Sequence, residues 1–421
     1  MAKISISDTF DGGRISYIGQ EENGNRVVLL RLQHDVYTEL EKKAHMQYFA
    51  FRSTVSNLNG EMNVVYNIEN AKEASYAEAW SGSTVFYTKT VTDSNSWRRV
   101  LDTVYDKHTG QLTWSFNHDR NGSVYFSYFP PFTYEQHLSL VDRCAAVAKV
   151  ESLGRTHDGR EMECVQCGTG DKVCWIIHRQ HPGETMAEYF AEGLLTRLLG
   201  LDSDGVVDGM ARRVLGMYRF FIVPCMCPDG AVRGHLRTNS VGANLNREWA
   251  DHGEYKAPTK ERSPEVYSVL KKMDETGVDM FLDIHGDEEI PYNFLCGAEN
   301  TKHWGPRLMN LHGAFLAAFC RANSDMQQPV GYPAPTDDRP APRNIATSAI
   351  ANRFNCLAAT LEMPFKDCLS NPDQERGWSP QRSRTLGASV LDPLAYIHPH
   401  LRDEDSWNHF PPQDEYVRPN Y

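Results

Sequence analysis

The sequence predicts two domains of different classes, an all-β, sandwich-like domain followed by an α/β domain with a doubly wound, mixed sheet. The chain has 421 residues, which exceeds the usual size of a single domain. Up to residue 127, short runs of β-branched and aromatic residues follow one another between turn residues. Beyond about residue 138, apolar strand-like runs alternate with amphipathic helical patterns. The first pattern is typical of a β-sandwich and the second of an α/β sheet.

Six runs define the expected strands of the N-terminal domain, which we place at residues 1–127. Asn-Gly pairs such as Asn59-Gly60 lie between some of them and predict turns. Pro130-Pro131 ends the last run, and residues 128–137 are interpreted as a linker. The expected strands cover residues 26–32, 47–55, 63–68, 83–91, 111–116 and 123–129.

The α/β domain is expected over residues 138–400, and residues 401–421 are interpreted as an extended tail. A helix is predicted over residues 132–150, where apolar residues recur every three to four positions. This alternation of element types predicts helices on both faces of a sheet. The expected strands cover residues 172–178, 219–225, 279–285 and 355–363, with a further helix from Ser263-Pro264 to Gly277.

The helix after the strand at residues 172–178 has clear start and stop signals. Thr185 and Glu188 have the spacing of a capping box, in which each side chain satisfies a free backbone N–H. Gly200 follows the last apolar position and predicts the end of this helix.

Composition and charge exclude several classes of protein. The formal net charge of −12 argues against a nucleic-acid binder with one broad basic face. The first residues lack a basic region followed by an apolar stretch, so we expect no secretory signal. No run approaches 18 apolar residues, so we expect no membrane span.

Ten cysteines are scattered through the chain, and several lie in apolar, strand-like runs. Without a secretory signal, we expect reduced thiols and a cytoplasmic location. Cys164-x-x-Cys167 resembles half of a zinc or redox motif, but no second pair follows at a suitable spacing. We therefore interpret these two residues as strand or turn cysteines.

Polar residues with metal-binding chemistry stand at the ends of three predicted strands of the α/β domain. His181 and Glu184 follow the first strand across a Pro-Gly turn, His285 ends another, and Glu362 lies near the end of a third. Ligands of open α/β sheets bind outside the carboxyl ends of the strands. Two histidines and one carboxylate, with a fourth position open, are typical of a catalytic zinc site. Taken singly, a histidine here would more often be a buried residue hydrogen-bonded to backbone, and a carboxylate could stand at a helix N-terminus. Their joint occurrence at the ends of predicted core strands favours the metal site.

Two further residues bear on this predicted metal site. His178 competes with His181 as a ligand, although it still belongs to the strand. Asp283 lies two residues before His285 on the same strand face and is expected to orient it.

A polar stretch at residues 227–249 forms a second group of candidate functional residues. It contains Arg237 and Arg247 together with side-chain amides, among them Asn246. Arginine binds carboxylates through two parallel hydrogen bonds, and an amide adds a further donor. Near a metal, such a group would hold a substrate carboxylate, although a surface loop can be equally polar.

Five motifs occur along the chain in the order HPGE, GHLRTN, NLNR, DIHG and TLEMPF. In combination they resemble those of the M14 zinc carboxypeptidases, and most closely those of the cytosolic carboxypeptidase, deglutamylase-like subfamily. That subfamily also has a β-rich domain before the catalytic one, joined through an aromatic, proline-containing segment similar to residues 129–137. The resemblance covers about residues 1–395 and implies a zinc carboxypeptidase domain at residues 138–400.

The resemblance implies a role for each of these motif residues. His181, Glu184 and His285 correspond to the ligands of one zinc ion per chain. Arg237 corresponds to the arginine that polarises the scissile carbonyl. Glu362 corresponds to the general base.

Substrate-binding residues follow from the same resemblance. Asn246 and Arg247 correspond to the pair that holds the terminal carboxylate, and Tyr332 is the candidate for a mobile tyrosine over the substrate. Members of the subfamily prefer acidic C-terminal residues and use a basic group in the side-chain pocket. Arg343 and Arg353, in the stretch before the general base, are the candidates for that group.

We therefore expect a zinc-dependent metallocarboxypeptidase that removes the C-terminal residue of peptides or proteins, with a preference for acidic residues. Neither nucleic acid nor a membrane is expected as a partner, and the oligomeric state is not predicted. One alternative is a zinc amidohydrolase of the succinylglutamate desuccinylase or aspartoacylase kind, which shares the zinc pair and an Asn-Arg motif but acts on small N-acyl amino acids. Another is a peptide-binding module that has lost catalysis.

Overall fold

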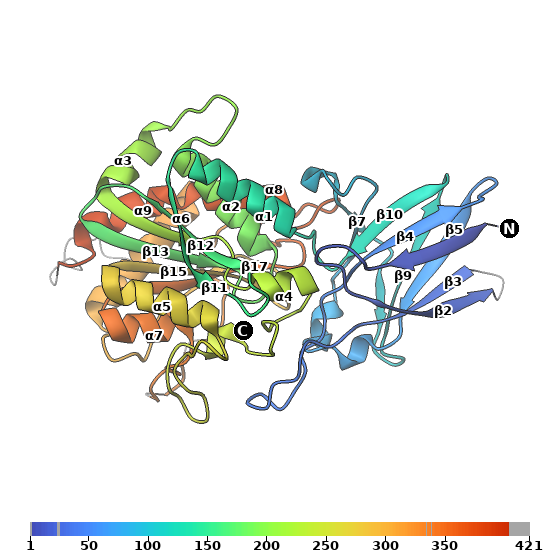
Figure 1. Cartoon of the computed structure of the whole chain (residues 1–421), viewed down its shortest axis with the longest axis horizontal. Helices are drawn as coiled ribbons and strands as arrows, with labels where there is room; N and C mark the ends of the chain where they lie inside the picture. Colours follow the sequence, from blue (N-terminus) through green and yellow to red (C-terminus); the bar gives the residue numbers. More distant parts are fainter. Residues whose placement is uncertain (1, 23–25, 334, 338, 404–421) are drawn as a thin grey trace.

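The computed structural model describes residues 2–22, 26–333, 335–337 and 339–403 as two domains that lie side by side (Figure 1). The tail expected over residues 401–421 lies outside the described residues from position 404 onward. In the described part of the chain, no helix is both long and apolar enough to cross a membrane. All ten cysteines lie in the described part of the chain, and none of them forms a disulfide bond there.

The N-terminal domain consists of two sheets that pack face to face, which confirms the predicted sandwich-like class. Tyr66 of one sheet lies 4.7 Å from Phe126 of the other, between ring centres, and 5.5 Å from Trp114 of its own sheet. Aromatic side chains therefore fill much of this core. One sheet has the order β1 (Lys3–Ser7), β4 (Ala50–Ser56), β10 (Gly122–Ser127), β6 (Val85–Thr88) and β7 (Arg98–Val100). The other has the order β2 (Ser16–Glu22), β3 (Arg26–Arg31), β5 (Met62–Ile68), β9 (Gln111–His118) and β8 (Val104–Asp106).

The second domain is built on a mixed sheet, as predicted. Its central strands run parallel, and antiparallel strands complete both edges. Cys164 and Cys167 both lie in strand β12, which confirms that they are strand cysteines. The strand order is β11 (Lys149–Arg155), β12 (Glu161–Cys167), β14 (Tyr218–Val223), β13 (Lys172–His178), β15 (Met280–Asp287), β17 (Leu357–Pro364) and β16 (Phe294–Cys296).

Helices cover both faces of this sheet (Figure 1). Successive residues of β13 alternate between two apolar cores, because side chains of a strand point to opposite faces. Trp175 belongs to the core formed with α5 and α7, and Ile176 to the core formed with α2, α6, α8 and α9. The helices are α1 (Tyr134–Ala145), α2 (Met186–Leu199), α3 (Gly209–Met217), α4 (Pro228–Arg233), α5 (Pro264–Thr276), α6 (Pro306–Ala322), α7 (Ala346–Phe354), α8 (Pro380–Ser389) and α9 (Leu391–Ile397). Short 3-10 helices are η1 (Ala71–Glu73), η2 (Ala77–Trp80), η3 (Ser94–Ser96), η4 (Leu245–Arg247) and η5 (His398–His400).

The helix predicted over residues 132–150 is shorter in the structure. Helix α1 ends at Ala145, and strand β11 begins at Lys149, so the last predicted residues belong to the sheet. The start of α1 carries a capping box that was not predicted from the sequence. Thr133 accepts a hydrogen bond from the backbone of Gln136, and the Gln136 side chain accepts one from the backbone of Thr133.

The start of helix α2 differs from the prediction. The prediction of a capping box at Thr185 and Glu188 is wrong. The Thr185 side chain does not cap the helix, and its hydroxyl donates to the carbonyl of Pro130 (2.7 Å). Glu188 is fully buried and binds other residues instead. The end of the helix is as predicted, because Gly200 adopts the left-handed conformation, with φ of 66°.

Glu188 joins three elements through a buried ion-pair cluster. Its carboxylate accepts from His137 Nδ1 of α1 (2.6 Å) and from Arg179 Nη1 after β13 (2.7 Å). His137 also contacts Glu163 through Nε2 (3.2 Å). Burial lowers the pKa of His137, but the charges of Glu188 and Glu163 outweigh it and raise the pKa to about 9.

This cluster predicts a loss of stability in mildly alkaline solution. Because the pKa of His137 is about 9 when folded and 6.5 as its ordinary value, its contribution is complete below pH 6.5 and is lost as the pH rises through 9. The contribution is at most roughly 3 kcal/mol. We expect the melting temperature to fall between pH 7 and pH 9.5, and to fall less in His137→Gln. Equal slopes for both proteins in a thermal-shift series would contradict this assignment.

Candidate active site

The turn that follows strand β13 is fixed by a buried arginine. Arg179 has a positive φ of 55°, an unfavourable conformation for a side chain of this size. Its guanidinium donates to the carbonyls of Pro182 (2.9 Å) and Phe132 (2.9 Å) and pairs with Glu188. These contacts hold the strained backbone in place, so the residues that follow are presented in one geometry.

Gly183 brings this turn against the stretch that contains Arg237. Its backbone N–H donates to the carbonyl of Leu236 (2.9 Å), and a Cβ at this position would lie 2.9 Å from the same oxygen. Only glycine permits this approach without a backbone shift. The HPGE and GHLRTN motifs are therefore in direct contact.

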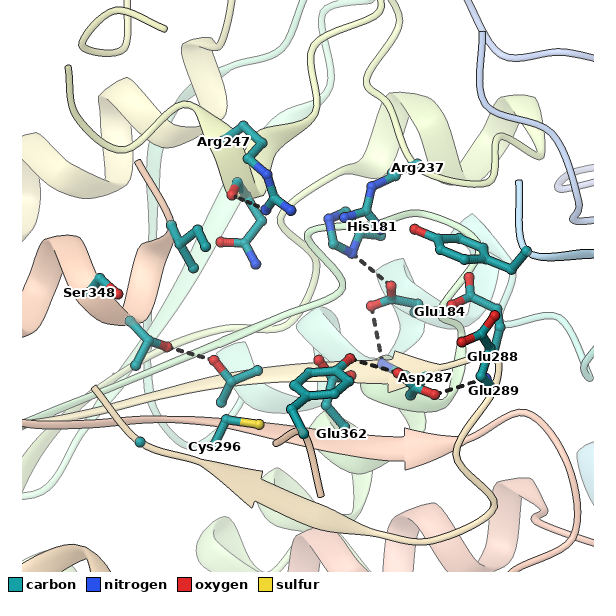
Figure 2. A pocket seen from close by; sticks show the side chains of 18 residues that line it. His181, Glu184, Arg237, Arg247, Asp287, Glu288, Glu289, Cys296, Ser348 and Glu362 are labelled. Atoms are coloured by element: carbon teal, nitrogen blue, oxygen red, sulfur yellow. Dashed lines mark hydrogen bonds and ion pairs between the residues drawn. The ribbon is translucent and has the colours of Figure 1, made fainter. Parts of the chain in front are cut away.

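The ligand atoms of the three predicted metal ligands lie within 4.8 Å of one another. Figure 2 shows two of these residues, His181 and Glu184. His181 Nδ1 lies 2.7 Å from Glu184 Oε1, His285 Nδ1 lies 2.8 Å from Glu184 Oε2, and the two Nδ1 atoms are 3.2 Å apart. All three side chains are buried. His178 is not part of this group, since it is buried at the end of β13 and its Nδ1 bonds to the carbonyl of Val223 (2.9 Å).

The donor set fits a zinc ion. Burial and the charge of Arg237 lower the pKa of His181 to about 3, so its imidazole is neutral, as a ligand must be. Burial would also lower the pKa of His285, but the charges of Asp283 and Glu184 outweigh it and raise that pKa. Two imidazoles and one carboxylate leave a coordination position open for water or substrate, unlike a closed structural site.

Each histidine has a partner on its other ring nitrogen. Asp283 Oδ2 lies 2.9 Å from His285 Nε2, so the predicted contact between them is confirmed. Gln180 Nε2 donates to the same carboxylate (2.6 Å), and Trp249 Nε1 donates to Gln180 Oε1 (2.8 Å). Such outer partners fix the tautomer and the ring orientation of a metal-binding histidine.

The partner of His181 was not predicted from the sequence. Asn244 Oδ1 lies 3.1 Å from His181 Nε2. Asn244 stands two residues before Asn246, in the stretch whose amides were expected to clamp a carboxylate. Only the place of Asn244 in the NLNR motif could have indicated a function, because its partner His181 is 63 residues away in the chain.

Glu362 lies beside His181, Glu184 and His285, which are called the metal group below, because of strand register. On the parallel strands β15 and β17, His285 and Glu362 are directly paired, so both side chains share one face of the sheet. Glu362 Oε2 has no hydrogen-bond partner among the described residues, although it is buried. Burial raises the pKa of Glu362 well above its usual range. A bound divalent cation would oppose that shift.

A cavity of about 460 Å³ opens beside these residues, and both predicted arginines line it. The Arg237 and Arg247 side chains lie on the opposite side of the cavity from Glu362 (Figure 2). Asn246 Oδ1 accepts from the backbone of Ala346 (2.9 Å), which leaves its NH₂ group available. The lining residues are Tyr76, His181, Glu184, Arg237, Asn246, Arg247, Gly286, Asp287, Glu288, Glu289, Cys296, Gly297, Tyr332, Ile345, Thr347, Ser348, Thr360 and Glu362.

Tyr332 reaches the cavity, whereas the two candidate specificity arginines do not. The Tyr332 hydroxyl donates to Asp287 Oδ2 (2.6 Å), and its ring contacts Phe294 edge-on. Arg353 forms an ion pair with Asp274 on the surface (2.6 Å), and Arg343 is exposed. Neither is among the residues that line the cavity. Tyr76, which the N-terminal domain contributes to the lining, was not predicted as a site residue, because it lies in no motif.

Known proteins are similar to both domains. Residues 6–129 match the model of the cytosolic carboxypeptidase N-terminal domain, and residues 134–369 match that of the zinc carboxypeptidases of family M14. A protein of Zymomonas mobilis is 38% identical over 93% of this chain and 96% of its own length. Human cytosolic carboxypeptidase 6 is 26% identical over 59% of this chain, and the match covers 51% of the human protein.

Solved structures give the same result. A metallo-carboxypeptidase from Burkholderia cenocepacia is 38% identical with a TM-score of 0.83, over 94% of this chain and 99% of that one. A metallo-carboxypeptidase from Pseudomonas aeruginosa, in complex with (2-guanidinoethylmercapto)succinic acid, is 35% identical with a TM-score of 0.84, over 94% of this chain and 100% of that one. The chain therefore belongs to the M14 family of zinc carboxypeptidases and carries the N-terminal domain of the cytosolic carboxypeptidases.

Proposed function

We propose that this protein removes the C-terminal residue of peptides or proteins by hydrolysis, with one zinc ion held by His181, Glu184 and His285. One observation carries the proposal: the guanidinium groups of Arg237 and Arg247 lie across a single cavity from the buried carboxylate of Glu362, with His181 and Glu184 beside them (Figure 2). This arrangement has separate places for a terminal carboxylate and for the bond to be cut.

The zinc ion, Glu362 and Arg237 have distinct roles in the proposed reaction. Zinc, when bound, lowers the pKa of a water molecule to about 7 and polarises the scissile carbonyl. Glu362 takes the proton of the attacking water and later passes it to the leaving amine, as general base and then general acid. Arg237 donates to the developing oxyanion, an interaction typically worth about 3 kcal/mol in the transition state.

Arg247 and Asn246 are proposed to hold the terminal carboxylate, so that only the last peptide bond reaches Glu362. Burial and the charge of Arg237 lower the pKa of Arg247, and a bound carboxylate would offset both effects. The relative from Pseudomonas aeruginosa was solved with a substituted succinic acid, which is a carboxylate ligand. An amidohydrolase acting on small N-acyl amino acids is the alternative, and the match to the cytosolic carboxypeptidase N-terminal domain favours the peptidase.

If Arg247 and Asn246 hold the terminal carboxylate, the enzyme needs a substrate with a free C-terminal carboxylate. In Arg247→Ala, we expect kcat/KM to fall roughly 10- to 150-fold, because a charge-assisted hydrogen bond is worth about 1.5–3 kcal/mol. The measurement compares one peptide as free acid and as C-terminal amide. The wild type should strongly prefer the acid, and the variant should lose most of that preference. An unchanged preference would contradict the assigned role.

The preference for acidic C-terminal residues is a further proposal. Beyond Arg237 and Arg247, the described cavity lining contains no cation, and the groups left to receive a side-chain carboxylate are hydroxyls such as those of Thr347 and Ser348. Matched peptides ending in Glu, Gln and Lys test it. Faster release of Glu than of Gln, with a larger loss for Glu in Ser348→Ala, would support it, and equal rates would contradict it.

The whole proposal is tested with a peptide library of different C-terminal residues and with N-acyl amino acids, each with and without a chelator. Release of C-terminal residues that stops with the chelator and returns with added zinc would support the peptidase. Deacylation alone would favour the amidohydrolase, and an inert zinc-loaded protein would favour a binding module. A cytoplasmic location is also proposed, in agreement with ten cysteines that form no disulfide bond in the described part of the chain.

A further inference from the structure

One segment of the N-terminal domain contacts the candidate active site from outside the cavity. It comprises residues 32–49, joins β3 to β4, and is called the β3–β4 segment below. Its buried Thr38 accepts a hydrogen bond from Arg262 of the catalytic domain. Two of its carboxylates, Asp35 and Glu41, bind residues next to the metal group and to Arg237.

Glu41 is connected to a metal ligand through a single intermediate side chain. Glu41 Oε1 accepts a hydrogen bond from Asn244 Nδ2, and Asn244 Oδ1 in turn lies 3.1 Å from His181 Nε2. His181 Nδ1, on the other side of the ring, faces Glu184. The second carboxylate oxygen of Glu41 contacts His45 of the same segment.

The direction of these hydrogen bonds determines which nitrogen of His181 is free to bind metal. An ionised carboxylate only accepts, so Glu41 requires the NH₂ end of the Asn244 amide. The amide oxygen must then face His181 and accept its Nε2–H, which leaves Nδ1 with a lone pair toward the metal. A flipped amide would favour the other tautomer, with a proton on Nδ1, where a ligand needs none.

Glu41 has the protonation state that this role requires. Burial raises the pKa of its carboxyl, but the contact with His45 and the charge of Arg237 outweigh it and lower the pKa to about 2. The carboxylate therefore remains an acceptor throughout the neutral range.

Asp35 acts on the other half of the site. Its carboxylate accepts from the backbone N–H groups of Leu236 (2.8 Å), Arg237 (2.8 Å) and Thr238 (3.0 Å). These donors are 201 to 203 residues away in the chain, and Asp35 is buried. Three donors on one carboxylate fix the backbone from which the Arg237 side chain extends into the cavity.

We infer that the N-terminal domain supplies two positioning residues for the reaction, Glu41 for the metal ligand His181 and Asp35 for the oxyanion donor Arg237. The domain is then part of the catalytic apparatus and not only a neighbour of it. This inference rests on the proposed function, because it takes His181 as a zinc ligand and Arg237 as a donor to the substrate.

Zinc affinity tests the Glu41 part without reference to turnover. In the full chain, we expect Glu41→Ala to weaken zinc binding 10- to 100-fold in a chelator competition, as loss of an outer partner does in other zinc proteins. Glu41→Gln retains an acceptor oxygen for Asn244 and should stay within about threefold of the wild type. Thr38→Val, which removes another contact of the same segment, should leave the affinity unchanged.

A double-mutant cycle separates this connection from a general loss of domain packing. If Glu41 acts on His181 only through Asn244, the double variant Glu41→Ala/Asn244→Ala should bind zinc as tightly as Asn244→Ala alone. Additive losses, or equal losses in Glu41→Ala and Thr38→Val, would overturn the inference. Near-UV circular dichroism of each protein shows whether it has folded. If Glu41→Ala has not folded, Asn244→Ala provides the test, because it removes the same connection to His181 and should weaken zinc binding to the same extent.

Asp35→Asn tests the second residue by a different measurement. We expect kcat to fall about tenfold with little change in KM or zinc affinity, because Arg237 acts on charge that develops in the transition state. A fall in zinc affinity with unchanged kcat would overturn the assignment. If the wild type binds zinc and hydrolyses peptides while all these variants match it, only the inference fails. If the wild type binds no zinc, the proposed function fails as well.

Discussion

Glu362→Gln is expected to retain its zinc ion and to lose nearly all turnover. The substitution keeps the shape of the side chain, and Glu362 Oε2 has no hydrogen-bond partner among the described residues, so the metal group should remain intact. An amide cannot take a proton from water, and general-base catalysis contributes about 10²–10⁴-fold. We therefore expect kcat to fall by at least about 10²-fold, with zinc content measured on the same samples.

KM provides the internal control for Glu362→Gln. Because Arg247 and Asn246 are proposed to bind the substrate carboxylate on the other side of the cavity, KM should change little. Loss of zinc from the variant would mean that the activity loss has a different cause. Substantial turnover in a zinc-loaded variant would remove the role assigned to Glu362.

Glu184→Gln is expected to abolish tight zinc binding and, with it, activity. Glu184 contacts both histidines, through Oε1 and Oε2, and supplies the only negative charge among the three ligands. The amide of the variant can still accept from the backbone of Gly286, which donates to Glu184 Oε2 (3.1 Å), so the fold should survive. Zinc affinity from chelator competition should fall by more than the 10- to 100-fold typical of outer partners.

Asp283→Asn is the matched control for Glu184→Gln. It is equally buried and one step further from the metal, in contact with His285 Nε2 (2.9 Å). Its effect on zinc affinity should be the smaller of the two, within 10- to 100-fold. A loss in Asp283→Asn as large as in Glu184→Gln would contradict the assignment of Glu184 as a direct ligand.

Several parts of the fold could be predicted because they depend on local sequence. Buried parallel strands such as β13 and β17 are continuous apolar runs, and helix α5 begins at Pro264 and is followed by Gly277, as predicted. Among the strands that were missed, β12 has seven residues and lies inside the sheet, whereas β7, β8 and β16 have three residues each. Runs of that length carry no readable period.

The metal group could also be predicted, since its position follows from topology. Parallel strands place their carboxyl ends at one edge of a sheet, so His181, Glu184, His285 and Glu362 had to lie close together once β13, β15 and β17 were neighbours. The specificity residue could not be predicted in this way. Arg353 is in the expected stretch, but its orientation on α7 places it against Asp274, outside the cavity.

The sequence by itself determined the two fold classes and predicted the grouping of His181, Glu184 and His285 with the nearby carboxylate of Glu362. Only the tertiary structure decided that Nδ1 of each histidine faces Glu184 and which residues contact the other ring nitrogen. It also decided that Glu188 belongs to an ion-pair cluster and that Asp35 supports the backbone of Arg237, 202 residues away. The physical reason is that strand periodicity and turn signals act between near neighbours, whereas hydrogen-bond partners are chosen only when distant segments pack together.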